Sequence, residues 1–271
     1  MKRIGIIFLG FLIAVSVLMV GCGEDVENPG NPPELPPKAS LTANLGNFPQ
    51  NEDGRVDETN AKGNFLFAAV NVGFWQTLVG AAIVIPAAAF EAAFDESFEY
   101  VASERKWKSS YTVGTSGSLI SAELYAENKG ETVGWEMYLS QEGQFDRFLW
   151  FTGESRVDNT GGEWILYTTP ADPKEVLHID WDRNGADFIN SKYVMVDSES
   201  SKEGSFIEYG LSTEADFTHY YEVSVVDTEG DDYDAFILFN ETTTEGRIKS
   251  EAYFGDSDFR CWDDGLEDID C

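Results

Sequence analysis

The sequence predicts a mainly β protein: one antiparallel β-meander of about eleven strands, an open barrel or strongly curved sheet packed around N-terminal apolar helices. From Trp107 onward, short runs alternate apolar and polar residues and are separated by turn clusters, which is typical of half-buried antiparallel strands. Before them, residues 65–98 form the most apolar stretch that follows the N-terminal leader. A sheet with one solvent-exposed face must bury its other, apolar face, and this stretch is the segment available to pack against it.

Residues 1–21 are expected to be a signal peptide. Lys2 and Arg3 form a charged beginning, and an apolar run follows directly. The run ends in Leu-Met-Val-Gly before Cys22, which resembles the lipobox of bacterial lipoproteins, with Met19 where Leu is usual. The resemblance implies that Cys22 becomes the acylated first residue of the mature protein, carrying palmitate among several acyl chains that anchor it stably. The alternative is an ordinary signal peptide followed by a chance cysteine.

Acidic residues follow soon after Cys22. Glu24 and Asp25 resemble the surface-export signal of lipoproteins in the Bacteroidota, and no aspartate follows Cys22 directly, as inner-membrane retention would require. The resemblance implies a lipid-anchored outer-membrane protein, and it leaves open whether the protein faces the periplasm or the cell surface.

Residues 22–62 are expected to be the lipidated N-terminus and a Pro-rich tether. Five prolines fall between positions 29 and 37, and such a segment favours extended polyproline geometry over a packed core. Leu41, Leu45 and Phe48 are the residues in it that we expect to dock onto the following domain, residues 63–271.

The apolar stretch is expected to be helical over residues 65–102, as two helices that meet at Pro86. Proline is tolerated in a first helical turn, so the pieces are residues 65–85 and 86–102. The first piece is apolar nearly all round, which predicts burial on most sides. A membrane span is the alternative, since the length would suffice. Against a span, no basic flank marks a cytoplasmic side and the lipobox already supplies an attachment.

Four later segments show the clearest strand alternation, and in each of them one set of side chains is expected to face the core. These sets are Ile120, Ala122, Leu124 and Ala126; Trp135, Met137 and Leu139; Leu177, Ile179 and Trp181; and Tyr221, Val223 and Val225. Residues 145–156 and 186–197 alternate poorly and are expected to be bulged or twisted. Five tryptophans in predicted helix or strands are expected in the core: Trp75, Trp135, Trp150, Trp164 and Trp181.

A curved sheet around a helix is similar in outline to the lipid-carrying lipoprotein chaperones of the periplasm and their mycobacterial relatives. Those families place helices between later strands, and residues 198–204 are too few for one here. The mature domain also resembles uncharacterised lipoproteins of the Bacteroidota, a likeness that implies no activity.

Charge and cysteines narrow the classes of function. The formal net charge of -31 repels nucleic acid and anionic lipid headgroups, so nucleic-acid binding is excluded as a leading idea. Cys261 and Cys271 lie close together at the far end of the chain, and we expect them to form a disulfide in an oxidising compartment.

One acidic segment matches half of a calcium loop. Asp180, Asp182 and Asn184 alternate before Gly185, but position twelve is Ser191 where a bidentate glutamate is needed. The favoured interpretation is a hairpin whose turn is residues 182–185. Calcium is thus a secondary hypothesis, and no other cofactor is expected.

The sequence offers little for catalysis. It contains two histidines, His178 and His219, and none of the common hydrolase, metalloprotease or phosphate-loop motifs. His219 is expected to fill space near a strand start. Tyr125 and Tyr138 face outward in the predicted sheet and would suit a glycan-binding face if further aromatic residues lay in line with them.

The resulting expectation is a non-catalytic, lipid-anchored envelope lipoprotein that serves as a structural or surface-interaction module. The alternative is a carrier that holds an apolar ligand, such as a lipid, between helix and sheet. A cavity of several hundred Å³ in that position would favour the carrier, and close packing would favour the module.

Overall fold

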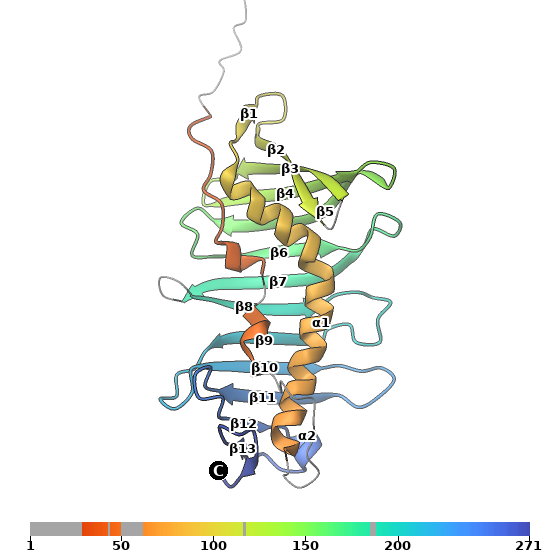
Figure 1. The fold of residues 1–271 in the computed structure, drawn as a ribbon. Coiled ribbons are helices and arrows are strands. Elements are labelled where there is room, and N and C mark those ends of the chain that lie inside the picture. Colours follow the sequence, from red (N-terminus) through yellow and green to blue (C-terminus); the bar gives the residue numbers. More distant parts are fainter. Residues whose placement is uncertain (1–28, 43, 50–61, 116–117, 185–187) are drawn as a thin grey trace, which may run out of the picture. The chain divides into compact units, whose positions relative to one another are not determined.

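Fourteen antiparallel strands form one sheet in the described part of the chain, and they lie side by side in sequence order (Figure 1). The computed structural model describes residues 29–42, 44–49, 62–115, 118–184 and 188–271. The prediction of about eleven strands was too low. β1, β13 and β14 are three, three and two residues long, too short for their alternation to be recognised.

The strands are β1 (Glu99–Val101), β2 (Lys106–Thr115), β3 (Ser118–Asn128), β4 (Thr132–Gln141), β5 (Phe145–Arg156), β6 (Gly161–Tyr167), β7 (Glu175–Asn184), β8 (Phe188–Met195), β9 (Phe206–Leu211), β10 (His219–Val225), β11 (Tyr233–Phe239), β12 (Gly246–Lys249), β13 (Arg260–Trp262) and β14 (Asp268–Ile269).

The predicted core faces of the four clearest strands are confirmed, because every residue predicted to face inward on them is buried. Two-residue periodicity places alternate side chains on opposite faces, so burial of one set follows directly from the sequence pattern. Residues 145–156, whose poor alternation predicted a bulged or twisted strand, do form an irregular strand. β5 pairs with β4 through register shifts near Tyr138 and Leu139. Trp150 lies on this irregular strand and is only half-buried, so its prediction as a core residue was wrong.

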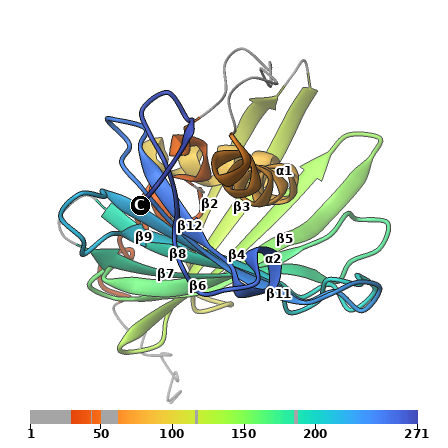
Figure 2. The ribbon, with the colours of Figure 1, turned by 90° about the horizontal axis from the view of Figure 1, so that it is seen from below.

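A single long helix, α1 (Gly63–Ala92), lies along the concave side of the curved sheet (Figures 1 and 2). The prediction of two helices was wrong. α1 continues through Pro86, a short 3-10 turn η3 (Ala93–Asp95) follows, and the chain is already a strand at Glu99. Proline inside a helix removes a backbone hydrogen bond at a cost of about 3 kcal/mol. Pro86 is buried with the inner face of α1, and packing there offsets the loss.

The N-terminal strap, residues 31–42 and 44–48, packs beside α1 on the same face of the sheet. It contains two 3-10 turns, η1 (Lys38–Ser40) and η2 (Asn44–Asn47). Leu41, Leu45 and Phe48 dock as expected and are 0, 2 and 2 % exposed. The compact unit therefore begins at Asn31, and part of the segment expected to be a tether is folded. Of the preceding unit, Met1–Gly30, the structure describes the last two residues.

The end of the chain closes onto the start of α1. The carboxylate of Asp268, in β14, accepts hydrogen bonds from the backbone N–H groups of Gly63 and Asn64, each at 3.0 Å. The Asn64 amide donates to the carbonyl of Cys261 at 2.9 Å. The first N–H groups of a helix have no partner within it, so a carboxylate from the last strand caps the first helix.

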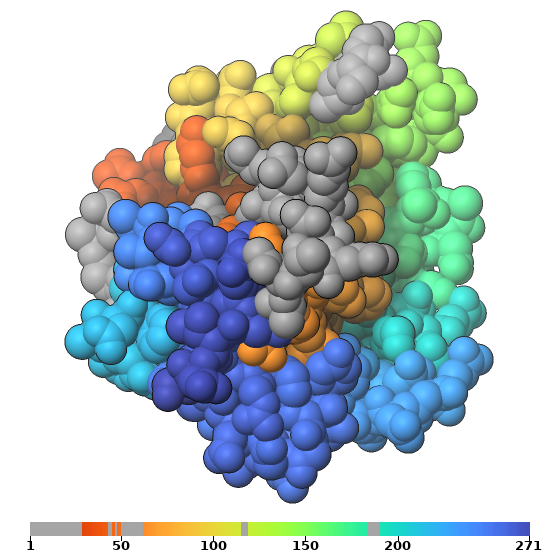
Figure 3. Space-filling model, turned by 60° about the horizontal axis from the view of Figure 1, so that its bottom comes forward, coloured from red at the N-terminus to blue at the C-terminus, as the bar shows by residue number. Residues whose placement is uncertain are grey.

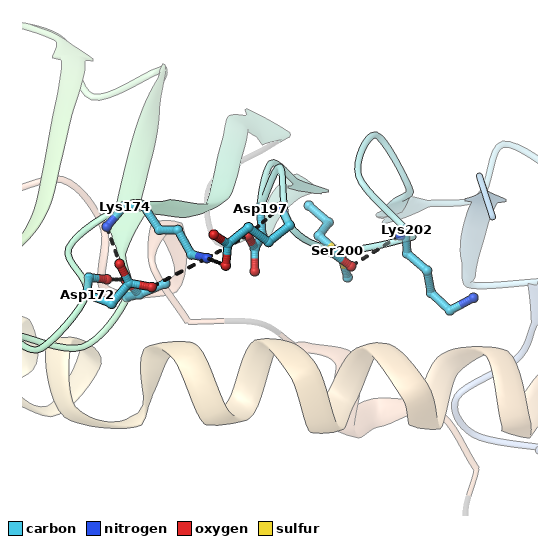
Figure 4. A network of polar contacts seen from close by, with 8 residues as sticks. Asp172, Lys174, Asp197, Ser200 and Lys202 are labelled. Carbon is cyan, nitrogen blue, oxygen red and sulfur yellow. Dashed lines mark hydrogen bonds and ion pairs between the residues drawn. The ribbon is translucent and has the colours of Figure 1, made fainter. Parts of the chain in front are cut away.

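Ion pairs connect neighbouring loops at one side of the sheet (Figure 4). Lys174, before β7, places its Nζ 3.2 Å from Asp197 and 3.5 Å from Asp172, and it also contacts Glu199. In the same loop after β8, the Ser200 hydroxyl accepts a hydrogen bond from the backbone N–H of Lys202 at 3.2 Å. The ion pairs of Lys174 with Asp197 and Glu199 join the β6–β7 and β8–β9 connections.

Candidate functional site

The space between α1, the strap and the sheet is filled by large side chains. The largest fully buried ones are Trp75, Trp135, Trp164, Trp181, Trp262, Tyr193, Tyr209, Tyr221, Phe48, Phe65, Phe90 and Phe151. Phe48 lies at the centre of one group: its ring is 5.3 to 6.4 Å from those of Phe65, Tyr221, Phe239 and Trp262. Five hollows of about 260 to 680 Å³ lie on the described residues, and no residue of α1 lines any of these five.

The outward face of α1 is apolar and exposed. Val70, Phe74 and Val84 are 69, 39 and 64 % exposed, and Thr77 and Ala81 complete the series. Steps of four and three residues keep these five on one face of a helix. We call them the apolar stripe. The prediction that this segment is buried on most sides was wrong, because the sheet covers only its inner face.

No charged residue interrupts the apolar stripe. Residues 63–90 carry no charge in a chain of net charge -31. The polar side chains of this run bond within the protein. Asn71 donates to the carbonyl of Phe67 at 2.8 Å and accepts from the Tyr233 hydroxyl at 2.9 Å. The exposed Thr77 hydroxyl donates to the Gly73 carbonyl at 2.9 Å, so it does not need water as a partner.

α1 with η3 is long and apolar enough to cross a membrane by length and composition, and 33 % of its most apolar window is buried. The inner face of α1 packs on the sheet. This packing favours a helix lying at a surface over one crossing a bilayer. Figure 3 shows α1, in orange, reaching the surface between the blue C-terminal strands and the green middle strands. At one end of the stripe, the ring of Phe67 stacks 3.7 Å from that of the exposed Tyr253, in α2 (Glu251–Phe254).

The predicted lipidation residue, Cys22, lies outside the described residues. Cys261 and Cys271 are brought together as predicted, with their Cα atoms 5.2 Å apart and their sulfur atoms bonded. The crosslink joins β13 to the chain end just after Asp268, and so holds the segment that caps α1.

The calcium hypothesis receives no supporting geometry. β7 extends to Asn184, so the turn expected at residues 182–185 does not form there, and Asp180 and Asp182 lie within a strand. Asp182 accepts a hydrogen bond from Arg156 at 3.1 Å. The side chain of Asn184 lies outside the described residues. Within the described ranges, no three His, Cys, Asp or Glu side chains are grouped so that they could hold a metal ion.

The two histidines lie far from each other in the sheet. His178, on the exposed face, has its Nε2 2.9 Å from Glu175. His219 is 7 % exposed and stacks on Tyr209 and Phe239 with ring centroids 5.3 and 5.6 Å apart, which confirms its space-filling role. Burial lowers the pKa of His219 below its ordinary value, although Glu241 opposes the shift.

Tyr125 and Tyr138 do not form an open aromatic platform. Tyr125 is 4 % exposed, and the ammonium of Lys108 and the guanidinium of Arg147 lie over its ring at 5.3 and 5.7 Å. Arg147 also covers Tyr138 at 3.9 Å. The guanidinium and ammonium groups occupy the ring faces that a sugar would need.

The sequence could have predicted the apolar stripe only in part. The absence of charge between positions 63 and 90 is visible in the sequence, but the burial of each face depends on how much of the helix the sheet covers.

Searches for a matching protein-family model, curated protein or solved structure found none.

Proposed function

We propose that this protein is a non-catalytic surface-interaction module that an acylated Cys22 anchors to a bacterial outer membrane. The observation that carries the proposal is the apolar stripe, an exposed and uncharged helix face in a strongly acidic chain. Contiguous apolar surface with polar surroundings marks sites of interaction with proteins or membranes. The lipobox resemblance at Cys22 supports the membrane attachment.

The partner of the apolar stripe in this proposal is the membrane itself, in a region of uncharged headgroups. Cys22 and Asn31 are nine residues apart, a distance that an extended chain spans in at most about 30 Å. The strap then passes the C-terminal end of α1, where the Nζ of Lys38 is 3.3 Å from Glu91 and 5.1 Å from the centre of the Phe94 ring. An acylated Cys22 would thus keep the folded unit close to a bilayer.

The packed interior supports a module over a carrier. A carrier of apolar ligands needs room for a guest, and drug-sized ligands occupy pockets of roughly 300–1,000 Å³. The side chains between α1 and the sheet fill that position with aromatic rings whose centroids lie 5.3 to 5.8 Å apart.

The test uses acylated protein purified from the envelope and mixed with phosphatidylcholine vesicles. A Val84→Cys variant carries an environment-sensitive dye on the apolar stripe, and a Val157→Cys variant carries it on the β5–β6 turn as a control. Both side chains are exposed, at 64 and 52 %. The dye at position 84 is expected to shift to shorter emission wavelengths and to be quenched by spin-labelled lipid, while the dye at position 157 stays in water.

Two failures can be told apart. Protein that does not float with the vesicles contradicts the lipid anchor. Protein that floats while both dyes report water contradicts membrane contact by the apolar stripe and leaves the anchor in place.

A further inference from the structure

The two edges of the sheet are built differently. At one edge lie β13 and β14, which are three and two residues long. Acidic residues lie within and beside this edge: Asp263, Asp264, Glu267, Asp268 and Asp270. Natural proteins use short strands and charged side chains to keep a sheet edge from pairing with another chain. The edge at β14 therefore has the features of a protected edge.

The opposite edge, at β1 and β2, is long and lacks these features (Figure 1). β1 pairs with residues 106–108 of β2. Within the described residues, 109–115 of β2 pair with β3 on one side and with no strand on the other. We call residues 109–115 the open edge. It contains no charged residue and no proline, and its register with β3 runs without a bulge. Such an edge is a template for an added strand.

The open edge is already fixed in the extended form that an added strand requires. On its inner side, the Tyr111 hydroxyl donates a hydrogen bond to the carbonyl of Ala89, in α1, at 2.7 Å. On its outer side, Ser110, Thr112 and Gly114 are exposed. Alternate residues of an antiparallel strand direct their N–H and C=O groups to opposite neighbours, so the open edge presents backbone groups to a further strand. A preorganised edge pays little ordering entropy when it pairs.

The open edge also has room for side chains of an added strand. A Cβ atom on Gly114 would meet nothing within 4 Å. Leu119, which pairs with Gly114 from β3, is 71 % exposed. Because Gly114 has no side chain, a side chain of the added strand can reach across it to Leu119. Burial of this apolar side chain would add to the backbone hydrogen bonds.

Charge indicates which partner fits the open edge. Two copies of a chain with net charge -31 repel each other over most of their surfaces, and like charges placed directly opposite in a sheet are destabilising. Antiparallel pairing of the open edge with its own copy avoids this repulsion, because the residues that come into register are uncharged. Two identical antiparallel strands are related by a twofold axis, so one surface serves both copies.

From these observations we propose that two copies of this protein associate through their open edges, which pair antiparallel and join the two sheets into one. The protected edge at β14 ends the assembly in each copy, so the product is a closed dimer and not a filament. A single short ladder is smaller than the interfaces of obligate dimers, which bury roughly 2,000 Å² or more, so the dimer is weak and reversible. The proposal does not depend on the anchor or on the apolar stripe.

Sedimentation velocity tests the proposal with mature protein in a polyoxyethylene detergent that covers the acyl chains. As the protein concentration rises from micromolar to submillimolar, the protein should change reversibly from monomer to dimer. Thr112→Lys places a charge on the open edge of each copy, where the two ammonium groups would repel each other. We expect it to weaken the dimer about tenfold, which corresponds to about 1.4 kcal/mol.

Two control variants carry the same added charge elsewhere on exposed positions. Ser121→Lys lies on β3, where Ser121 pairs with Thr112 one strand in from the open edge, and Val84→Lys lies on the apolar stripe. Both should dimerise like the unmodified protein. A monomer at every concentration, assembly beyond the dimer, or a dimer that Thr112→Lys weakens no more than Ser121→Lys does would each overturn the proposal. Loss of the dimer with Val84→Lys would place the interface on the apolar stripe and overturn it as well.

Discussion

At the scale of single residues, His219 gives the sheet a dependence on pH. The ring is stacked between Tyr209 and Phe239, and its Nδ1 is 2.8 Å from the Thr218 hydroxyl. Burial lowers the pKa of His219 in the folded protein, so the unfolded chain binds a proton more readily than the native one. The contribution of this residue to stability is therefore complete above the unfolded pKa and declines as the pH falls towards the folded pKa.

We expect His219→Phe to remove part of the acid sensitivity of the protein, because phenylalanine keeps the stacking and does not titrate. Urea unfolding at pH 7.5 and 5 measures it. The free energy of unfolding should fall more over this interval for the protein with His219 than for the variant, by at most about 1.4 kcal/mol per pH unit. Between pH 7.5 and 9 the two should change in parallel. Equal losses below pH 6.5 would contradict the neutral, buried state of this histidine.

At the scale of elements, the first turn of α1 has no local cap and is capped by a residue from the far end of the sheet. Its N-cap residue, Lys62, supplies no side-chain hydrogen bond, and no acidic residue lies in its first turn. The carboxylate of Asp268 takes both roles. The sequence separation of more than two hundred residues explains why no local pattern predicted this cap.

Asp268→Ala should destabilise the protein by about 0.5–2 kcal/mol, the usual cost of losing an N-terminal cap. Asp270→Ala is the matched control, since Asp270 is an exposed aspartate two residues away. Thermal or urea unfolding of both variants gives the comparison. If the two substitutions have the same effect, Asp268 does not stabilise α1 through its cap.

Elements differ in how far the sequence predicts them. The inward sets on β3, β4, β7 and β10 were predictable because each strand's alternation is complete within a few residues. The continuity of α1 through Pro86 was not, since local preferences at proline favour a break and only tertiary packing decides otherwise.

At the scale of the whole molecule, two segments outside the sheet fill its concave side. The strap and α1 bring Phe48, Phe65 and Trp75 against the inner faces of the strands, and the chain end then caps α1. This arrangement leaves the apolar stripe of α1 exposed. We propose that the protein acts through this surface and holds no guest between helix and sheet.

Native mass spectrometry of protein extracted from the envelope tests that claim most directly. We expect one species that begins at Cys22, carries covalent acyl chains there, contains the Cys261–Cys271 disulfide and retains no further lipid. A stoichiometric, non-covalent lipid that leaves only when the protein unfolds would contradict the packed interior and favour a carrier. A mature chain without acyl mass would contradict the anchor.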